Sequence, residues 1–185
     1  SLLKIPTVVT LMGLDVLSHK DDFFYGFIGV YGNRFANLAV QNADVILVLG
    51  SRLDTRQTGK CYREFAKHAR IVHIDIDKNE INHKVKSDIS ICCDLKAFMH
   101  CFIREIKNSL MFPDYQGWLK LLQTWKEKYS EQNLNGEGIS PNWFIGQVGK
   151  LVEDNTIFTA DVGQNQMWVA QSLRLNVNKF RILNS

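Results

Sequence analysis

The chain has 185 residues, of which 45% are apolar and 22% charged, and its formal net charge at pH 7 is +3. These values are ordinary for a globular protein and exclude a strongly basic nucleic-acid-binding chain. No apolar run approaches the length of a membrane span, so we expect neither nucleic acid nor a membrane as a partner. The length accommodates one domain, or one domain and part of another.

The first half of the chain alternates apolar strands with helices. Strands are predicted at residues 5–10, 44–50, 70–77 and 88–93, and helices at 34–43, 62–69 and 78–84. The continuous apolar run at 44–50 predicts a strand that is buried on both faces of a parallel sheet. This alternation is typical of an α/β fold.

Residues 11–33 lie between the first strand and the first helix and are predicted to form a glycine-punctuated loop. The loop is rich in phenylalanine and tyrosine, which are unusual in a solvent-exposed segment. We therefore expect it to pack on a ligand, a neighbouring domain or another subunit.

Residues 94–108 are predicted to form an amphipathic helix, which Asp94 could cap. Six apolar residues recur at the spacing of one helix face: Leu95, Phe98, Met99, Phe102, Ile103 and Ile106. Such a stripe is expected to face a core.

The second half of the chain begins with a connector. A helix with Trp118 and Trp125 on one face precedes a polar, glycine-containing linker at 130–138. Ser140 as N-cap and Pro141 at the first helical position then restart a helix, which leads to a strand at 156–160. We infer that a second α/β unit begins near residue 140.

Four cysteines, Cys61, Cys92, Cys93 and Cys101, show no C-x-x-C spacing. His100 beside Cys101 could suggest zinc, but the spacing matches no familiar ligand pattern. We expect buried free thiols in a reducing cytoplasm.

The strand predicted at 44–50 ends in a glycine, and two arginines follow it. Gly50, Arg52 and Arg56 lie at the carboxyl end of this strand, where open α/β sheets bind ligands. Arginines there suit a phosphate or diphosphate. A surface salt-bridge cluster with Asp54 is an equally good interpretation.

Acidic residues follow the next strands. Asp75 is placed to bind a ribose hydroxyl, whereas Asp77 is expected to cap a helix. Asp94 fits both roles.

Two further segments end strands. For "TLMG" at 10–13, core packing of Leu11 and Met12 is the better local interpretation. In "FTADVGQNQMWVAQ", at 158–171, a strand tip delivers backbone and amide groups to a ligand.

Four segments in order along the chain carry a family resemblance. They read "IPTVVTLMGLDVL", "GFIGVYGNRFANLAVQNADVILVLGSRLDTRQTG", "IVHIDIDKNEI" and "FTADVGQNQMWVAQ". Together they resemble the thiamine-diphosphate-dependent enzymes, and within these the acetolactate synthase large subunits. Any one of these segments would be moderate support for the resemblance, whereas all four in order and at compatible spacing are strong support for it.

The resemblance implies a domain organisation. Residues 1–112 would form a three-layer, parallel-sheet central domain of the DHS-like, FAD/NAD-binding-like kind, without its first strand and helix. Residues 113–139 would be a connector with one helix. Residues 140–185 would be the beginning of the diphosphate-binding domain, a partial second α/β unit.

The resemblance also implies a function for the parent protein. It would be a carboligase that decarboxylates pyruvate and condenses it with a second 2-keto acid, in branched-chain amino acid biosynthesis. Thiamine diphosphate and Mg²⁺ would be its cofactors, with FAD a further candidate. The parent would be a cytoplasmic homodimer or homotetramer, with a regulatory subunit as a further candidate partner.

Site residues are carried over by position. Those expected along FAD are Thr10, Leu11, Met12, Gly32, Gly50, Arg52, Arg56, Asp75 and Asp94. Those expected at thiamine diphosphate are Gly163, Gln164 and Asn165. The resemblance places the catalytic glutamate and the Mg²⁺ ligands outside these segments, so no catalytic or metal-binding residue is assigned and the chain alone is expected to be inactive.

The chain departs from the family pattern at three places. Val30-Tyr31 replaces a Met-His pair, Thr55 replaces the second Asp of Asp-Asp-Arg, and Asn165 replaces a His. Two alternatives therefore stay open: a related thiamine-diphosphate-dependent 2-keto-acid decarboxylase, and a non-catalytic FAD- or nucleotide-binding α/β module.

Overall fold

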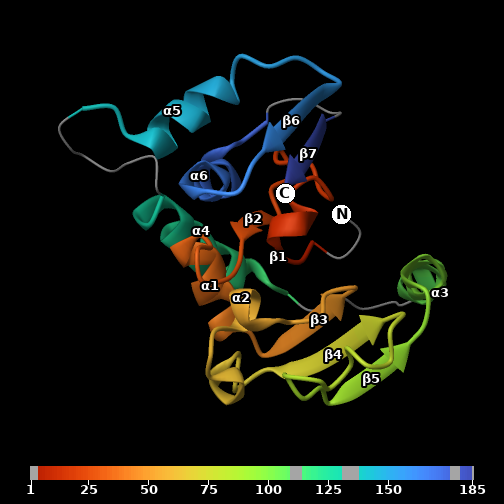
Figure 1. Cartoon of the computed structure of the whole chain (residues 1–185). Coiled ribbons are helices and arrows are strands. Elements are labelled where there is room, and N and C mark those ends of the chain that lie inside the picture. Colours follow the sequence, from red (N-terminus) through yellow and green to blue (C-terminus); the bar gives the residue numbers. More distant parts are fainter. Residues whose placement is uncertain (1–3, 109–113, 131–137, 176–179, 185) are drawn as a thin grey trace. The chain divides into compact units, whose positions relative to one another are not determined.

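The computed structural model describes residues 4–108, 114–130, 138–175 and 180–184 (Figure 1). The chain divides into two compact units. Unit 1 combines residues 1–38 with 116–185, and unit 2 comprises residues 39–115. The division falls within helix α1 (Arg34–Gln41), and each unit is described by itself.

Unit 2 is built on a parallel three-stranded sheet in the order β3–β4–β5 (Figure 1). Its elements are β3 (Val45–Leu49), α2 (Thr55–Thr58), a 3₁₀ turn (Tyr62–Glu64), β4 (Arg70–Asp75), β5 (Ile89–Cys92) and α3 (Leu95–Asn108). Leu49 pairs with Ile74, and Asp75 pairs with Cys92. Because the strands are parallel, their carboxyl ends share one edge of the sheet.

The burial of β3 corrects one expectation. Val45 is 57% exposed and Leu49 is 37% exposed, so the strand is not buried on both faces along its length. The reason is its position, since β3 pairs with β4 on one side and with no other described strand on the other. Only Val48 in this strand is fully buried, where it joins a cluster with Leu53 and Ile71.

Helix α3 confirms the predicted amphipathic pattern. All six residues of the predicted face are half-buried, and the other residues of the helix are exposed. The rings of Phe98 and Phe102, one turn apart on this face, stack with their centroids 5.2 Å apart. The helix therefore turns its apolar stripe inward, although none of its residues is fully buried.

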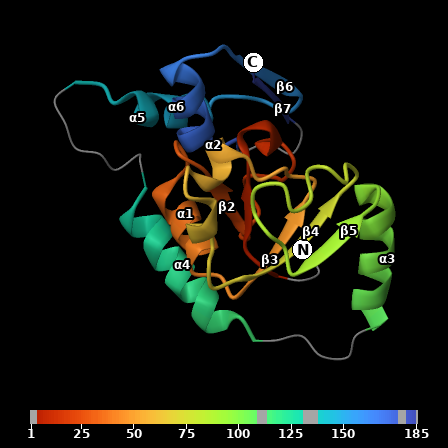
Figure 2. The ribbon, with the colours of Figure 1, turned by 60° about the horizontal axis from the view of Figure 1, so that its bottom comes forward.

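Unit 1 contains two parallel strand pairs and most of the remaining helices (Figure 2). The strands are β1 (Thr7–Val9), β2 (Phe24–Phe27), β6 (Thr156–Ala160) and β7 (Phe180–Asn184). The helices are α4 (Gln116–Lys128), α5 (Pro141–Val148) and α6 (Gln164–Ser172), and a 3₁₀ turn spans Leu11–Gly13. Strand β1 pairs with β2, and β6 pairs with β7. The chain is thus an α/β protein with parallel sheets, as predicted.

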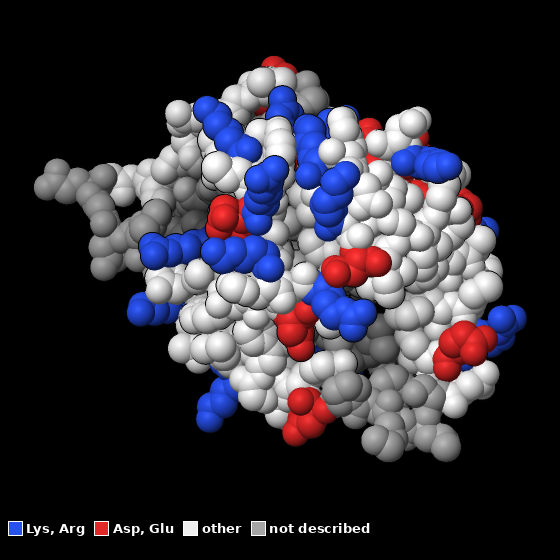
Figure 3. Space-filling model, turned by 90° about the horizontal axis from the view of Figure 1, so that it is seen from below, with Lys and Arg blue, Asp and Glu red and all other residues white. Residues whose placement is uncertain are grey.

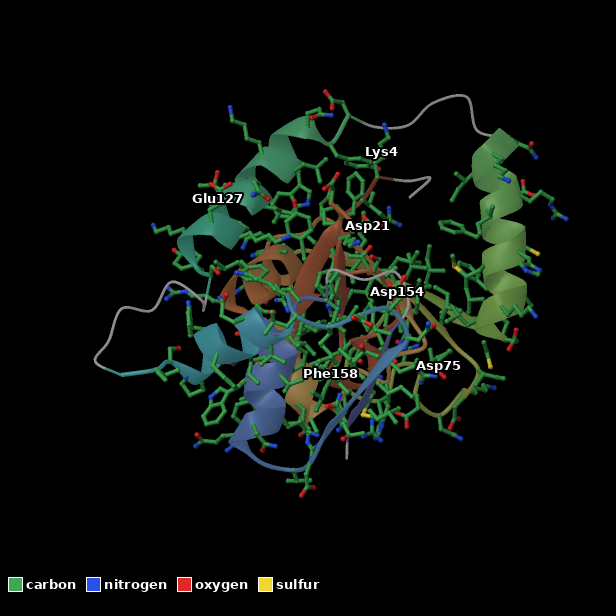
Figure 4. The ribbon with its side chains drawn as sticks, turned by 90° about the horizontal axis from the view of Figure 1, so that it is seen from above. Lys4, Asp21, Asp75, Glu127, Asp154 and Phe158 are labelled. Carbon is green, nitrogen blue, oxygen red and sulfur yellow. The ribbon has the colours of Figure 1, made fainter. Side chains whose placement is uncertain are left out.

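One hydrophobic core holds unit 1 together. Its buried residues come from both ends of the chain: Val9, Leu14, Phe24, Phe27, Ala170, Leu173, Leu175 and Ile182. Phe158 of β6, labelled in Figure 4, packs against this core. Burying a side chain of this kind stabilises the fold by about 1.5–3 kcal/mol. The sequence-based division at residues 112 and 139 stays a prediction.

Three local expectations were wrong. The predicted loop at 11–33 contains strand β2, and its aromatic residues Phe24, Tyr25 and Phe27 are buried. Residues 78–84 form turns rather than a helix. Asp77 accepts a hydrogen bond from the Asn79 N–H (2.9 Å), a local turn that competes with helix formation, so Asp77 caps no helix. Of the helix predicted at 62–69 only the short 3₁₀ turn is present.

Helix α5 begins as predicted and ends early. Ser140 Oγ accepts a hydrogen bond from the Trp143 N–H, and Pro141 occupies the first turn. The helix ends at Val148, so Leu151 lies beyond it and is 82% exposed.

The cysteines are free, as predicted, but they are not buried. Cys61, Cys92 and Cys101 are exposed and Cys93 is half-buried. The described residues contain no group of three or more His, Cys, Asp or Glu side chains arranged to hold a metal ion. None of the helices in the described ranges is long and apolar enough to cross a membrane.

Candidate functional site

The carboxyl edge of the sheet in unit 2 brings together five of the predicted residues: Gly50, Arg52, Arg56, Asp75 and Asp94. Gly50 directly follows β3, and its N–H donates to the Ile74 carbonyl (2.9 Å), which extends the pairing with β4 by one residue. Its φ of +59° lies in the left-handed region, which favours glycine. The chain can therefore turn sharply here and present the following loop at the edge of the sheet.

Arg52 and Arg56 differ in their environments. The Arg52 guanidinium donates to Asp54 Oδ2 through Nε (3.2 Å) and Nη2 (3.0 Å), so the salt-bridge interpretation holds for this arginine. Arg56 lies on α2 and is exposed, and no carboxylate in the described part of the chain pairs with it. Arg56 is therefore the better placed of the two to receive an anion.

Asp54 organises this loop. Its Oδ1 accepts a hydrogen bond from the Arg56 N–H (2.8 Å), and its own N–H donates to Gln57 Oε1 (2.9 Å), which completes a capping box. Partial burial alone would raise the pKa of Asp54, but the Arg56 N–H and the Arg52 guanidinium lower it below its ordinary value. Asp54 thus stays ionised and holds the Arg52 guanidinium and the Arg56 backbone N–H in place.

Replacing Asp54 with alanine should remove the cap and lower the free energy of unfolding by about 1 kcal/mol. The Asp54→Asn variant keeps a capping oxygen and should lose less. Urea unfolding followed by far-ultraviolet circular dichroism would measure both variants. Equal stability of the alanine variant and the wild type would contradict the capping role.

Asp75 and Asp94 each accept a hydrogen bond from a nearby backbone N–H through one carboxylate oxygen. Asp75 Oδ1 accepts from the Asp77 N–H (2.9 Å), and Asp94 Oδ1 accepts from the Ala97 N–H (2.9 Å) at the start of α3. The capping interpretation of Asp94 is therefore confirmed. Figure 4 labels Asp75 at the end of β4, where its carboxylate is half-buried.

Two buried polar side chains of unit 2 were missed by the sequence analysis. Ser51 Oγ and both ring nitrogens of His73 are buried and have no hydrogen-bond partner among the described residues. Ser51 lies between Gly50 and Arg52, so its hydroxyl is an unsatisfied group at the predicted ligand edge. Such groups normally find a partner, which a bound ligand can supply.

The other predicted flavin residues, Thr10, Leu11, Met12 and Gly32, lie in unit 1. Met12 is 71% exposed, so the core-packing interpretation was wrong for this residue, whereas Leu11 packs against the core. The Leu11 carbonyl accepts a hydrogen bond from Asn184 Nδ2 (2.9 Å). Thr10 precedes the 3₁₀ turn without capping it through its side chain.

Gly32 closes a tight turn after β2, which we call the Gly29–Gly32 turn. The Gly32 N–H donates to the Gly29 carbonyl (2.9 Å). Gly29, with φ of +124°, exchanges two hydrogen bonds with the Asn37 side chain, each 2.9 Å long. A Cβ atom on Gly32 would lie 2.6 Å from three backbone atoms of residues 27–29, so only glycine fits this position.

The three residues predicted for thiamine diphosphate also lie in unit 1, at the start of α6. Gly163, Gln164 and Asn165 are all exposed. Gly163 has a φ of +151°, and no side chain caps the helix that follows. The first backbone N–H groups of α6 are thus left for water or for an anion.

A groove of about 940 Å³ lies elsewhere in unit 1. Lys20, Asp22, Tyr25, Lys120 and Lys126 contribute to its lining. The pKa of Lys126 is lowered, mainly by burial and to a smaller extent by the charge of Arg174. The pKa of Tyr25 is raised, mainly by burial and to a smaller extent by the charge of Asp22. None of the predicted site residues lines this groove.

On the face shown in Figure 3, basic and acidic side chains are interspersed.

A protein-family model for the central domain of thiamine pyrophosphate enzymes matches residues 1–102, which is more than half of the chain. The chain belongs to the thiamine pyrophosphate enzyme family. The match covers both segments that carry the predicted flavin residues, and it ends within helix α3.

Curated relatives extend the similarity to almost the whole chain. The acetolactate synthase large subunit of Pyropia yezoensis is 34% identical over 177 residues, covering 93% of this chain and 29% of the relative. The chloroplastic acetolactate synthase 2 of Nicotiana tabacum is 38% identical over 173 residues, covering 90% of this chain and 26% of the relative. The acetolactate synthase large subunit of Lactococcus lactis is 38% identical over 172 residues, covering 91% of this chain and 29% of the relative. The chain thus spans less than a third of the length of these relatives.

Proposed function

We propose that the chain is part of a thiamine-diphosphate-dependent 2-keto-acid carboligase of the acetolactate synthase type. The observation that carries the proposal is the extent of the similarity, which continues from the central-domain match at residues 1–102 to 90% or more of the chain. The reaction is the decarboxylation of pyruvate and its condensation with a second 2-keto acid, in branched-chain amino acid biosynthesis.

The start of α6 fits the diphosphate group of thiamine diphosphate. The uncapped first turn offers N–H donors, and Gly163 lets the chain enter the helix without a side chain over them. Gly163, Gln164 and Asn165 would hold the diphosphate, with Mg²⁺ bound by residues outside the matched motifs. When bound, the cofactor supplies the nucleophilic carbon and the electron sink for decarboxylation. This chain contributes orientation, and we assign no catalytic residue to it.

The carboxyl edge of the unit 2 sheet fits the diphosphate and ribose of FAD. Arg56 supplies an unpaired cation, Ser51 supplies a buried hydroxyl without a partner, and Asp75 supplies a carboxylate. The family resemblance implies that FAD, when bound, would take no part in electron transfer in the main reaction.

We further propose that the parent is a homodimer or homotetramer, with a regulatory subunit as a candidate partner. The names of several relatives contain the words "large subunit", which supports a smaller companion. A cytoplasmic location stays a prediction, since the tobacco relatives are named as chloroplastic.

A thiamine-diphosphate-dependent decarboxylase is the second candidate. The substitutions Val30-Tyr31, Thr55 and Asn165 favour it, because they replace residues of the acetolactate synthase pattern. Assaying the full-length protein with pyruvate separates the two. Acetolactate as product supports the carboligase, whereas an aldehyde with no acetolactate supports the decarboxylase.

FAD titration of the purified chain tests the flavin proposal. Replacing Arg56 with glutamine should weaken binding at least about tenfold, because a charge-assisted hydrogen bond contributes about 1.5–3 kcal/mol. The matched control is Lys60→Gln, an exposed cation in the same loop, which should change the affinity less than twofold. Quenching of flavin fluorescence gives the dissociation constant. A folded wild-type chain that binds no FAD would overturn this part of the proposal.

A further inference from the structure

Hydrogen bonds join three residues with amide side chains in unit 1, which we call the amide cluster: Asn33, Asn142 and Gln171. Asn33 is fully buried, and its Oδ1 accepts a hydrogen bond from the Phe27 N–H (3.0 Å). Its Nδ2 donates to the Gln171 carbonyl (2.9 Å). The residue that follows the Gly29–Gly32 turn is therefore bonded to both β2 and α6.

Gln171, in the last turn of α6, contacts two other segments through its side chain. Its Nε2 donates to the Tyr31 carbonyl inside the Gly29–Gly32 turn (2.7 Å). Its Oε1 accepts from Asn142 Nδ2 on α5 (3.0 Å). Asn142 Nδ2 also donates to Ser172 Oγ (2.7 Å). One side chain thus joins the turn, α5 and α6.

These contacts link segments that the family match separates. The central-domain model ends at residue 102, and Gly32 is one of the predicted flavin residues within it. Gln171 lies 69 positions beyond the end of that match, yet it supplies the hydrogen bond that fixes the carbonyl next to Gly32. The Gly29–Gly32 turn is therefore held from outside the central-domain segment.

We propose that Gln171 is a positioning residue for flavin binding, which acts by fixing the Gly29–Gly32 turn against α6. The role of Gln171 in flavin binding rests on the proposed function, whereas its role in fixing the turn does not. The hydrogen bond to the Tyr31 carbonyl orders a short backbone segment before the ligand arrives, so less conformational entropy is lost on binding. Without it the turn is still closed by Gly29 and Asn37, and the neighbouring Asn33 still donates to the Gln171 carbonyl, but the Tyr31 carbonyl inside the turn is no longer bonded to α6.

Two variants separate positioning from general stabilisation. Gln171→Glu keeps the acceptor for Asn142 and loses the donor to the Tyr31 carbonyl. Asn142→Ala loses the donor to Gln171 and to Ser172 and leaves Gln171 Nε2 able to donate to the Tyr31 carbonyl. This variant therefore controls for the loss of the bonds between α5 and α6.

Hydrogen exchange of the Gly32 and Asn33 amides provides a readout that needs no ligand. We expect Gln171→Glu to speed exchange at these amides about fivefold, the factor that corresponds to the loss of one ordinary hydrogen bond. Asn142→Ala should leave them within twofold of the wild type. Equal acceleration in both variants would show general destabilisation and would overturn the inference.

FAD titration of the same proteins tests the functional part. Gln171→Glu should weaken FAD binding about fivefold, and Asn142→Ala should change it less than twofold. If the wild-type chain binds no FAD while the exchange difference holds, the flavin proposal fails and the structural role of Gln171 stands. If FAD binds all three proteins equally, the positioning role fails and the flavin proposal stands.

Discussion

Replacing Gly32 with alanine should destabilise unit 1 by about 3 kcal/mol, the upper part of the range for overpacking. The added Cβ would lie 2.6 Å from the Gly29 nitrogen, the Ile28 carbonyl carbon and the Phe27 oxygen. All three are backbone atoms of one tight turn, so no side-chain rotation relieves the contact. The turn would have to open, which would strain the Gly29 and Asn33 hydrogen bonds with it.

Tryptophan fluorescence measures this change selectively. All four tryptophans, Trp118, Trp125, Trp143 and Trp168, belong to unit 1. The control is Gly117→Ala in α4, where a Cβ meets nothing within 4 Å and helix propensity improves. That variant should stay within about 1 kcal/mol of the wild type, on the stabilising side. If the two variants unfolded at the same urea concentration, the packing of the Gly29–Gly32 turn would not be the cause.

Unit 1 should also lose about 3 kcal/mol of stability between pH 6.5 and pH 4 through His19 alone. Burial lowers the pKa of His19 from 6.5 to about 4, against the hydrogen bond to the Leu14 carbonyl and with help from Arg174. The imidazole Nε2–H donates to that carbonyl (2.8 Å), and Nδ1 accepts from the Leu175 N–H (3.2 Å). A proton on Nδ1 would face an N–H donor, so the folded state keeps the ring neutral.

The sign of the effect follows from the lowered pKa. Below pH 6.5 the unfolded chain binds a proton at His19 and the folded chain does not, so unfolding becomes easier. The loss levels off near pH 4, where the folded state is protonated as well. Carboxylates titrate near the lower end of this window, and a variant is needed to isolate the histidine.

The variant His19→Gln should be less stable than the wild type at pH 7, because it loses the stacking with Phe24. Its stability should fall less between pH 6.5 and pH 4, and the difference between the two curves is the contribution of His19. Urea unfolding at pH 7, 5.5 and 4.5, followed by tryptophan fluorescence, measures both. Parallel curves for the two proteins would rule out His19 as the titrating group.

Periodic patterns predicted much of the fold. The apolar face of α3 was correct at all six positions, because a stripe at helical spacing depends only on residues within one helix. Strand β2 was missed because Gly26 and Gly29 interrupt a run of aromatic residues, and glycine usually marks a loop. Gly26 is nevertheless required within β2, since a Cβ there would lie 2.5 Å from Asn33 Oδ1.

The candidate site was predictable only in part, for a related reason. The cap at Asp94 was predicted from the helix pattern, because capping depends on neighbouring residues. Gly32 was carried over from the family resemblance; the structure shows that it closes a tight turn, and its role at FAD stays a prediction. Nothing local distinguishes Gln171 from Gln164 on the same helix, because the partner of Gln171 is 140 positions away. Asn33 and Asn37 carry one weak signal, since they are four residues apart and lie on the same side of the start of α1.

The shared core of unit 1 has a consequence for how the protein folds. Leu14 and Phe24 are buried with Leu173 and Ile182, and the ion pair between Asp15 and Arg181 spans 166 positions. Contacts of such high sequence separation form slowly, because a long loop must close before they stabilise anything. On the ribosome, strands β1 and β2 must therefore wait, with their apolar side chains uncovered, until α6 and β7 have been synthesised. A chaperone that binds apolar segments would protect the nascent chain during this interval.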